Sequence, residues 1–469
     1  MSKKRAALLT ICILFLAVCA CYFLLALYYG NGFGVNTWIN GVYCTGKSVE
    51  EVNSELLSCM EAPNILIVDK DGNRYFIDLK CVDYKGDYLP PLNAYLKEQN
   101  SLLWMNNLAR KKDHALSPAV TYDEEKLREA FRSLEPVRQE LFRQEEYALF
   151  RDEEKGWQLY DGLTDRLDIE KAYEALKTVV DQGGHTLDLA EEDCYYDLPL
   201  TEEQKTVKRL WEALENFQDC DIVYDMGDAM LAISPKEAAC FVAVDEKGMP
   251  LLDEKGQPVL SEAAVRAYIA SLADRYDTYE KEREFLSTRG EIVTVAGGTY
   301  GTKLDQEAES AYLMENLLKP DVHTGIDLNH KPAYEKETTV RGRNDIGDTY
   351  IEVDMTQQKL YYYEDGELML ETDVVTGNMK RRMGTPEGVN FVYNKQKNRT
   401  LRGPGYATPV KYWMPVKGNI GIHDAGWRSE FGGSIYEKNG SHGCVNTPTD
   451  KMAELYDMVE IGTPVVMFY

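Results

Sequence analysis

The sequence predicts an α+β multidomain protein, in which an apolar N-terminal helix precedes two α+β modules and a mostly-β C-terminal domain. The chain has 469 residues, too many for one compact core, and its 44% hydrophobic and 28% charged residues are ordinary for globular proteins. One long uncharged apolar run opens the chain, and strand-like alternation is concentrated near its end. Length and pattern together indicate roughly three folded domains.

The net charge of the chain argues against two classes of partner. The net charge is −26, which argues against nucleic acid or an anionic membrane surface as the main partner. The acid is unevenly spread, because from Asp348 to Tyr469 there are 13 Lys and Arg against 16 Asp and Glu. We therefore expect an acidic, solvated middle region and a nearly neutral C-terminal domain.

The N-terminal segment predicts a membrane anchor. Residues 1–5 form a short basic tail, and residues 6–29 are uncharged and long enough to cross a bilayer. No Lys or Arg follows before Lys47, so the positive-inside rule places the N-terminus in the cytoplasm and the rest outside. A cleaved signal peptide is the rival, but its apolar core is usually shorter. A lipoprotein signal is weaker, because apolar residues continue beyond Cys21.

The ten cysteines fall into three groups. Three lie in the apolar segment, six lie in the middle region, and Cys444 stands alone near the end of the chain. Six is an even number in an oxidising compartment, so disulfides are possible, and Cys444 is the odd thiol that fits a reactive nucleophile. No Cys-x-x-Cys or His-x-x-x-His spacing is present, so we expect no metal site. The six are Cys44, Cys59, Cys81, Cys194, Cys220 and Cys240.

The middle region predicts two copies of one α+β module, at residues 30–200 and 201–335. Strand-like runs occur at 65–68 and 75–79. Three features recur at offsets of 137 to 139 residues, far longer than a solenoid period. They are the amphipathic runs from Tyr122 and Ser261, the pairs Leu167-Asp168 and Leu304-Asp305, and the segments 185–189 and 323–328. The chain then becomes polar from His330 to Asp348, and residues 336–348 are interpreted as a linker.

Residues 349–469 are predicted to form a mostly-β domain. Tyr350–Asp354 alternates, 359–363 is aromatic and β-prone, and Glu364-Asp365-Gly366 predicts a hairpin turn before a strand at 368–375. One helix is expected near 449–459, and Thr463–Phe468 is expected to close the domain as its last strand.

The residues that carry chemistry lie in this domain. The string Ser441-His442-Gly443-Cys444-Val445-Asn446 follows His423, with 17 residues between His423 and Ser441. A thiol attacks a carbonyl as thiolate, and an adjacent His is the usual means of lowering its pKa from about 8.5. Cys444 is therefore the predicted nucleophile, and His423 the general base and later acid. Gly443 permits a tight turn, so its N–H and that of Cys444 are candidates for an oxyanion hole.

Through these residues the chain resembles the L,D-transpeptidases with a YkuD-type catalytic domain, whose signature is an upstream His and then Ser/Thr-His-Gly-Cys-x-Asn. The two middle modules resemble the peptidoglycan-binding modules that often precede this domain. The resemblance implies that the backbone carbonyl of Asp424 orients His423, and it leaves open a role for the Asp424 carboxylate. It implies that Ser441 and His442 hold the loop around Cys444 and contact substrate. It also implies that Asn446 fixes the other side of this loop through hydrogen bonds of its side chain.

The residues that flank the signature are less specific. Trp427 lies four residues after His423, where the resembled family has an aromatic residue at the cleft, and Tyr406 is a second candidate for substrate binding. Either aromatic could equally belong to the core. Three cations could meet substrate carboxylates, although surface charge is the default for each: Arg402, Lys411 and Arg428.

The resemblance implies a two-step acyl transfer on peptidoglycan stem peptides, which serve as donor and acceptor. Cys444 would form a thioester with release of D-Ala, and an amine of a second stem would take the acyl group to give a 3→3 cross-link. Water as acceptor would make the enzyme an L,D-carboxypeptidase instead. The resemblance also implies that carbapenems acylate Cys444 and that the reaction needs no cofactor. We expect the protein to be a monomer.

Two other functions fit parts of the sequence less well. Sortase-like protein anchoring also uses an extracellular Cys and His, but the residues after Cys444 lack the arginine that this chemistry uses. A non-catalytic wall-binding or sensor protein is the alternative from another class, and the intact pair of Cys444 and His423 argues against it.

Overall fold

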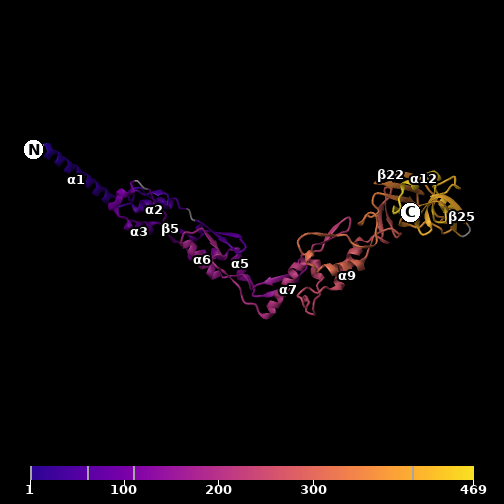
Figure 1. Cartoon of the computed structure of the whole chain (residues 1–469), viewed down its shortest axis with the longest axis horizontal. Helices are drawn as coiled ribbons and strands as arrows, with labels where there is room; N and C mark the ends of the chain where they lie inside the picture. The colour runs from indigo at the N-terminus through magenta and orange to yellow at the C-terminus, as the bar shows by residue number, and fades with distance from the viewer. Residues whose placement is uncertain (1–2, 61–62, 109–110, 404–405) are drawn as a thin grey trace. The chain divides into compact units, whose positions relative to one another are not determined.

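The computed structural model describes residues 3–60, 63–108, 111–403 and 406–469. The chain forms two compact units. The first contains residues 1–147 and 160–202, and the second contains residues 148–159 and 203–469. Figure 1 shows both units as mixtures of helices and short strands, so the fold class is mixed α+β, with a β-rich C-terminal part.

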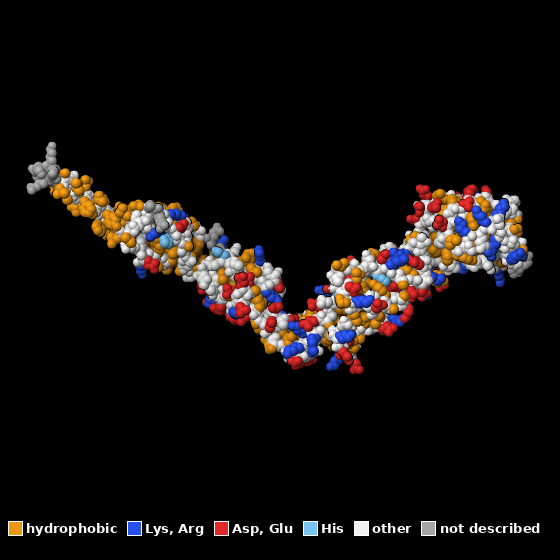
Figure 2. Space-filling view, viewed as in Figure 1, with side chains coloured by type: hydrophobic (Ala, Val, Ile, Leu, Met, Phe, Trp, Pro, Cys, Tyr) orange, Lys and Arg blue, Asp and Glu red, His pale blue; other side chains and the backbone are white. Residues whose placement is uncertain are grey.

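The chain begins with one long apolar helix, α1 (Lys3–Gly30). Within it, Ala7–Gly30 has a mean hydropathy of 2.8, and none of its most apolar stretch is buried against the rest of the protein. Figure 2 shows its hydrophobic side chains covering the helix, and Leu8, Phe15 and Leu27 are each more than 60% exposed. So large an exposed apolar surface is unfavourable in water. By length and composition, α1 is a signal sequence or a membrane anchor.

The first unit contains two small cores. The first is built around Phe33, Ile39 and Leu92. The second joins strands β3 and β4 to helices α4 and α6 through Ile67, Phe131 and other buried residues. After α1, the elements of this unit are β1 (Thr37–Ile39), β2 (Val42–Tyr43), α2 (Val49–Ser58), β3 (Asn64–Val68), β4 (Arg74–Asp78), η1 (Leu79–Val82), β5 (Lys85–Asp87), α3 (Leu89–Glu98), η2 (Ser101–Asn107), β6 (Lys112–His114), β7 (Ala119–Thr121), α4 (Glu124–Arg132), α5 (Glu135–Phe142), β10 (Arg166–Leu167), α6 (Ile169–Asp181), β11 (Thr186–Asp188) and β12 (Tyr195–Tyr196). Strands β8 (Tyr147–Asp152) and β9 (Gly156–Asp161) lie mostly within the second unit.

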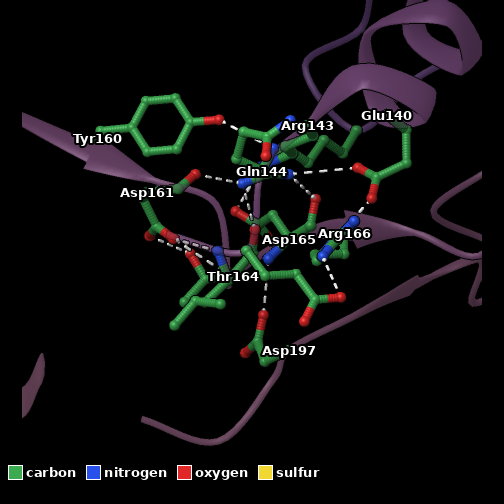
Figure 3. A network of polar contacts seen from close by, with 12 residues as sticks. Glu140, Arg143, Gln144, Tyr160, Asp161, Thr164, Asp165, Arg166 and Asp197 are labelled. Atoms are coloured by element: carbon green, nitrogen blue, oxygen red, sulfur yellow. Dashed lines mark hydrogen bonds and ion pairs between the residues drawn. The ribbon is translucent and has the colours of Figure 1, made fainter. Parts of the chain in front are cut away.

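Arg143 ties the end of α5 to the loop before β10. Its guanidinium donates to the carbonyl oxygens of Asp161, Thr164 and Asp165, at 2.6, 2.7 and 3.1 Å. Figure 3 shows these bonds converging on Arg143 beside the ion pair between Arg166 and Glu140. Each loop carbonyl thereby gains a partner, which fixes the loop without regular secondary structure.

The second unit begins with a part whose strand order repeats that of the first unit. In the sheet β14-β13-β18, β13 pairs antiparallel with β14 and parallel with β18, as β3 pairs with β4 and β11. Asp168 and Asp305 cap the helices after β10 and β17 alike. The elements are α7 (Glu202–Gln218), β13 (Ile222–Asp225), β14 (Met230–Ala232), α8 (Pro235–Cys240), α9 (Glu262–Tyr276), β15 (Arg283–Leu286), β16 (Ile292–Val295), β17 (Lys303–Leu304), α10 (Gln306–Asn316), η3 (Pro320–Val322), β18 (Leu328–His330) and β19 (Tyr334–Lys336).

The C-terminal part of this unit packs two sheets around one core. One sheet has the order β22-β21-β20-β28-β23, and the other has the order β24-β25-β26-β27. Buried Val353, Met414 and Val465 belong to their shared core, against which α12 packs Leu455. The elements are β20 (Tyr350–Asp354), β21 (Lys359–Glu364), β22 (Glu367–Asp373), β23 (Gly388–Phe391), β24 (Gln396–Gly403), β25 (Tyr406–Lys417), β26 (Ile420–Asp424), α11 (Ile435–Asn439), β27 (Val445–Thr447), α12 (Thr449–Met458) and β28 (Pro464–Phe468).

Long-range pairing places two segments of this region. The last strand, β28, lies inside the five-stranded sheet, between β20 and β23, and pairs with both. The predicted linker 336–348 was wrong at its first residue, because Lys336 ends β19 (Tyr334–Lys336), which pairs with β17. In both cases long-range pairing decides the position of a segment whose local pattern is correctly β-prone or polar.

The β15–β16 hairpin fastens the middle part of the second unit to the five-stranded sheet. Phe285 packs edge-on against Tyr350 and tilts against Phe468. Arg289 forms an ion pair of 3.2 Å with Asp354, which is 1% exposed. Gly298 forms a bridge with Val389 on β23. The attachment therefore combines an apolar core with a largely buried ion pair.

Candidate active site

One cleft in the C-terminal part brings most of the predicted catalytic residues together. Its volume is about 270 Å³. It is lined by residues from the four-stranded sheet, from the loop before β27, from the turn after β26, from the end of α11 and from the segment between β22 and β23. They are Arg381, Leu401, Thr408, His423, Trp427, Arg428, Asn439, Gly440, Ser441, His442, Cys444 and Asn446.

A parallel strand pair positions the nucleophile and the base. Strand β26 pairs with β27 so that Ile422 lies opposite Val445 and His423 opposite Asn446. This register places Cys444, one residue before β27, opposite Gly421. Because side chains alternate along a strand, His423 projects to the same side of β26 as position 421. The pairing therefore brings the base and the thiol to one face, although 20 residues separate them in sequence.

His423 is held in a single tautomer. It is 4% exposed, and its Nδ1 lies 2.8 Å from the carbonyl oxygen of Asp424. A carbonyl only accepts, so Nδ1 carries the proton and Nε2 keeps its lone pair. The rings of Trp413 and Trp427 flank the imidazole, with centroids at 5.8 and 5.9 Å. The arrangement presents a base with a fixed orientation.

The Asp424 carboxylate has a different partner. Its Oδ1 accepts hydrogen bonds from the backbone N–H groups of Lys411 at 2.7 Å and Tyr412 at 2.8 Å. These bonds fix β25 against β26. Asp424 therefore contacts the imidazole through its carbonyl, while its carboxylate holds the neighbouring strand.

The loop before β27 is fixed by Ser441 and requires a glycine. Ser441 Oγ accepts from the Gly443 N–H at 3.0 Å and donates to the carbonyl oxygen of Cys444. Gly443 has φ +115°, and a Cβ atom there would lie 2.6 Å from Cδ1 of Ile420. A side chain at this position is therefore strained by the backbone conformation, and the end of the Ile420 side chain would also have to move.

Thr385 is a further support of the loop that the sequence did not reveal. It is 3% exposed, accepts from the Gly377 N–H at 2.9 Å and donates to the Gly443 carbonyl at 2.8 Å. Thr385 lies outside the string 441–446 and far from His423 in sequence. Its contact with residue 443 is 58 residues away in sequence, so no local signal indicates it.

Burial sets the ionisation of the catalytic pair. It raises the pKa of the Cys444 thiol to about 11, opposed by hydrogen bonding to the Gly421 backbone. It also lowers the pKa of His423, opposed by the hydrogen bond to the Asp424 backbone. The thiol lies 3.7 Å from the carbonyl oxygen of Asn419, to which it donates. At neutral pH the resting pair is therefore a neutral thiol and a neutral imidazole.

The remaining predicted residues occupy distinct positions. His442 and Trp427 are exposed in the cleft, and Trp427 is 53% exposed. The backbone of Asn446 exchanges two hydrogen bonds with that of Val375, at 2.9 and 3.0 Å. The backbone of Tyr406 begins β25, but its side chain lies outside the part of the chain that is described. No group of three or more His, Cys, Asp or Glu residues able to hold a metal occurs among the described residues.

The cysteine count does not single out Cys444. All ten cysteines are free, including the six of the middle region for which disulfides were possible. Three of these thiols, those of Cys44, Cys194 and Cys220, are buried. Burial raises the pKa of each to about 11, so they are unreactive at neutral pH. What distinguishes Cys444 is its position in the cleft that His423 also lines.

Two family models match the chain. The model of the YkuD L,D-transpeptidase catalytic domain matches residues 348–467. A model described as "Putative peptidoglycan binding domain" matches residues 253–322. The first match includes the whole cleft, and the second includes α9, the β15–β16 hairpin and α10. No curated protein matches the chain.

Solved structures extend the similarity beyond the C-terminal part. A mutant of the Enterococcus faecium L,D-transpeptidase is 33% identical over 55% of this chain and 100% of that chain, with a TM-score of 0.48. The Ldtfm-avibactam carbamoyl enzyme is 34% identical over 56% of this chain and 99% of its own, with a TM-score of 0.48. The ertapenem-acylated catalytic domain from E. faecium is 49% identical over 26% of this chain and 98% of its own, with a TM-score of 0.25.

Proposed function

The chain belongs to the L,D-transpeptidase family, a family of cysteine enzymes, and on this premise we propose that it forms 3→3 cross-links in peptidoglycan through a thioester on Cys444. The observation that carries the proposal is the cleft in which His423 has its Nδ1 bound to the Asp424 carbonyl and Cys444 lies on the same face. This is the arrangement of a nucleophile with an oriented base.

Acylation begins from the neutral pair. His423 takes the thiol proton as Sγ of Cys444 attacks the carbonyl of the third residue of a donor stem. The tetrahedral intermediate collapses when the C–N bond breaks, and His423 delivers the same proton to the departing D-Ala amine. The low pKa of His423 favours this return, because a weakly basic imidazole releases its proton readily.

The developing oxyanion needs a backbone donor. In the resting state the Gly443 N–H is bound to Ser441 Oγ, so the Cys444 N–H is the proposed principal donor. The thioester is then attacked by a side-chain amine of a second stem, which loses its proton to His423. The new amide forms as the C–S bond breaks, and His423 returns the proton to the departing Cys444 thiolate. Thr385 and Ser441 act indirectly, because they hold the carbonyl and amide groups of the loop in place.

The other parts of the chain suit this reaction. We propose that α1 anchors the protein in the cell membrane with its N-terminus in the cytoplasm, and that the catalytic domain lies on the cell-wall side as a monomer. We also propose that both middle modules bind peptidoglycan. The family match to residues 253–322 supports the second module, and the equal strand order of the two sheets supports the first.

Product analysis tests the proposed function. The fragment 31–469 is incubated with disaccharide-tetrapeptide, and the products are identified by mass spectrometry. We expect release of D-Ala and formation of dimers, both abolished by Cys444→Ala. Trimmed tripeptide without dimer would show an L,D-carboxypeptidase instead, and an active Cys444→Ala variant would refute the assignment of the nucleophile.

A further inference from the structure

The cleft contains an arginine whose charge is not balanced by an acid. Arg428 is partly buried, and its Nη2 donates to the carbonyl oxygen of Asn439 at 2.8 Å. Its Nε is buried without a hydrogen-bond partner. Among the described residues, no carboxylate lies within ion-pair distance of Arg428. A partly desolvated cation with an unused donor is unfavourable in the free protein.

Other partly buried arginines of the same unit do have such partners. Arg283 pairs with Asp345 at 2.8 Å, and Arg289 pairs with Asp354 at 3.2 Å. The other cations considered near the signature, Arg402 and Lys411, are exposed to solvent. Arg428 therefore differs from all four in combining burial with the lack of an acidic partner.

The position of Arg428 follows from its place in the chain. Its backbone N–H donates to the carbonyl of Ala425 at 2.9 Å, in the turn that follows β26. Its guanidinium is bound to Asn439, which leads into the loop 440–444. The side chain thus bridges the segment after the base and the segment before the nucleophile, and lines the cleft with both. Arg381 adds an exposed positive charge to the same cleft.

We propose that Arg428 binds the C-terminal carboxylate of the donor stem peptide and thereby selects donors that end one residue after the scissile bond. This inference rests on the proposed function. In a tetrapeptide donor the leaving D-Ala carries that carboxylate, about 3.5 Å of chain beyond the attacked carbonyl. In a pentapeptide the carboxylate lies one residue farther away. A carboxylate supplies the missing partner of Nε and neutralises the guanidinium.

Binding to a catalytically inactive protein tests the inference. The stem tetrapeptide is prepared as the free acid and as the C-terminal amide, with lysine or diaminopimelate as third residue. Calorimetry measures the dissociation constants with Cys444→Ala and with Cys444→Ala/Arg428→Gln. We expect the amide to bind about 10- to 100-fold more weakly to the first protein, and less than about threefold more weakly to the second.

Three controls separate the explanations. Arg402→Gln removes an equal charge from the strand position after Leu401, on the opposite face from the cleft, and is expected to keep the acid preference. Arg428→Lys keeps the charge and is expected to retain part of the preference. An acid-to-amide ratio that Arg428→Gln leaves unchanged, or an equal weakening of acid and amide, overturns the inference and points to another carboxylate of the stem or to a purely structural role.

The role of Arg428 and the proposed function are tested by different measurements, so either one can be refuted without the other. The binding ratio is measured with Cys444→Ala and needs no turnover, whereas turnover of tetrapeptide by the unmodified enzyme tests the proposed function. A protein that shows the acid preference without dimer formation would keep the role of Arg428 and lose the transpeptidase assignment.

Discussion

Replacing Thr385 by valine is expected to loosen the nucleophile loop without changing the shape of the core. The hydroxyl of Thr385 serves two buried groups, the Gly377 N–H and the Gly443 carbonyl. Valine has nearly the same volume but offers neither bond. Serine keeps the hydroxyl and loses only a methyl group, so Thr385→Ser is the matched control.

The expected cost follows from the groups left unsatisfied. A buried polar group without a partner costs about 1–3 kcal/mol, and the added methyl group of valine returns about 0.8 kcal/mol. For two groups we expect a loss of about 1–5 kcal/mol in the free energy of local opening. One factor of ten corresponds to about 1.4 kcal/mol, so amide exchange in the loop should accelerate roughly 5- to 4000-fold.

Hydrogen exchange and acylation measure this prediction together. Exchange is followed by mass spectrometry on peptides that cover 376–386 and 440–447. Acylation is followed by the mass increase with ertapenem, a member of the carbapenem class that is expected to acylate Cys444. We expect Thr385→Val to acylate at least about tenfold more slowly at temperatures where it is folded. If Thr385→Ser behaves like Thr385→Val, or if neither exchange nor acylation changes, the two hydrogen bonds do not support the loop.

Three more predictions concern ionisation. With a pKa of about 11, only about 0.03% of Cys444 is thiolate at pH 7.5, so its alkylation by iodoacetamide, read by peptide mass spectrometry, should rise about tenfold per pH unit between 7 and 10; a rate independent of pH between 6 and 8 would show a preformed ion pair. Burial lowers the pKa of His423, and Trp427→Ala should expose the imidazole ring to water and so raise this pKa. The acidic limb of the pH profile of the acylation rate should then move to higher pH, and an unchanged limb contradicts this prediction. Arg283→Met should cost about 3–5 kcal/mol at pH 7.5, because it leaves Asp345 buried without its partner. Burial raises the folded-state pKa of Asp345, so the native state binds more protons and the loss should shrink between pH 7.5 and 5, as urea unfolding at each pH would show.

Local pattern predicted many elements of the C-terminal part. Tyr350–Asp354 alternates and forms β20, and the Asp365-Gly366 turn, with φ of +49° and +81°, joins β21 to β22. The helix expected near 449–459 is α12, Thr449–Met458. The long hairpin of β24 and β25 was not predicted, because β24 is polar and largely exposed and carries little periodic signal.

The candidate site was predictable where residues are adjacent in sequence and not where they meet through folding. The string 441–446 and His423 were identified from the sequence alone. Thr385, Trp413 and Arg428 gain their roles from long-range pairing. In particular, the sequence presents Arg402, Lys411 and Arg428 as three equivalent cations. Only burial and the missing acidic partner distinguish Arg428 from the other two.

In the catalytic domain, one sheet contacts the β15–β16 hairpin and the other carries the strand residues of the cleft. The β15–β16 hairpin holds the five-stranded sheet through Phe285 and through the ion pair of Arg289 with Asp354. Every strand residue that lines the cleft comes from the four-stranded sheet. A module that binds the wall through residues 253–322 would therefore load the sheet that carries no catalytic side chain. A direct link from the middle part to the four-stranded sheet is the hydrogen bond of 3.5 Å from Thr299 Oγ1 to the Val416 carbonyl oxygen on β25.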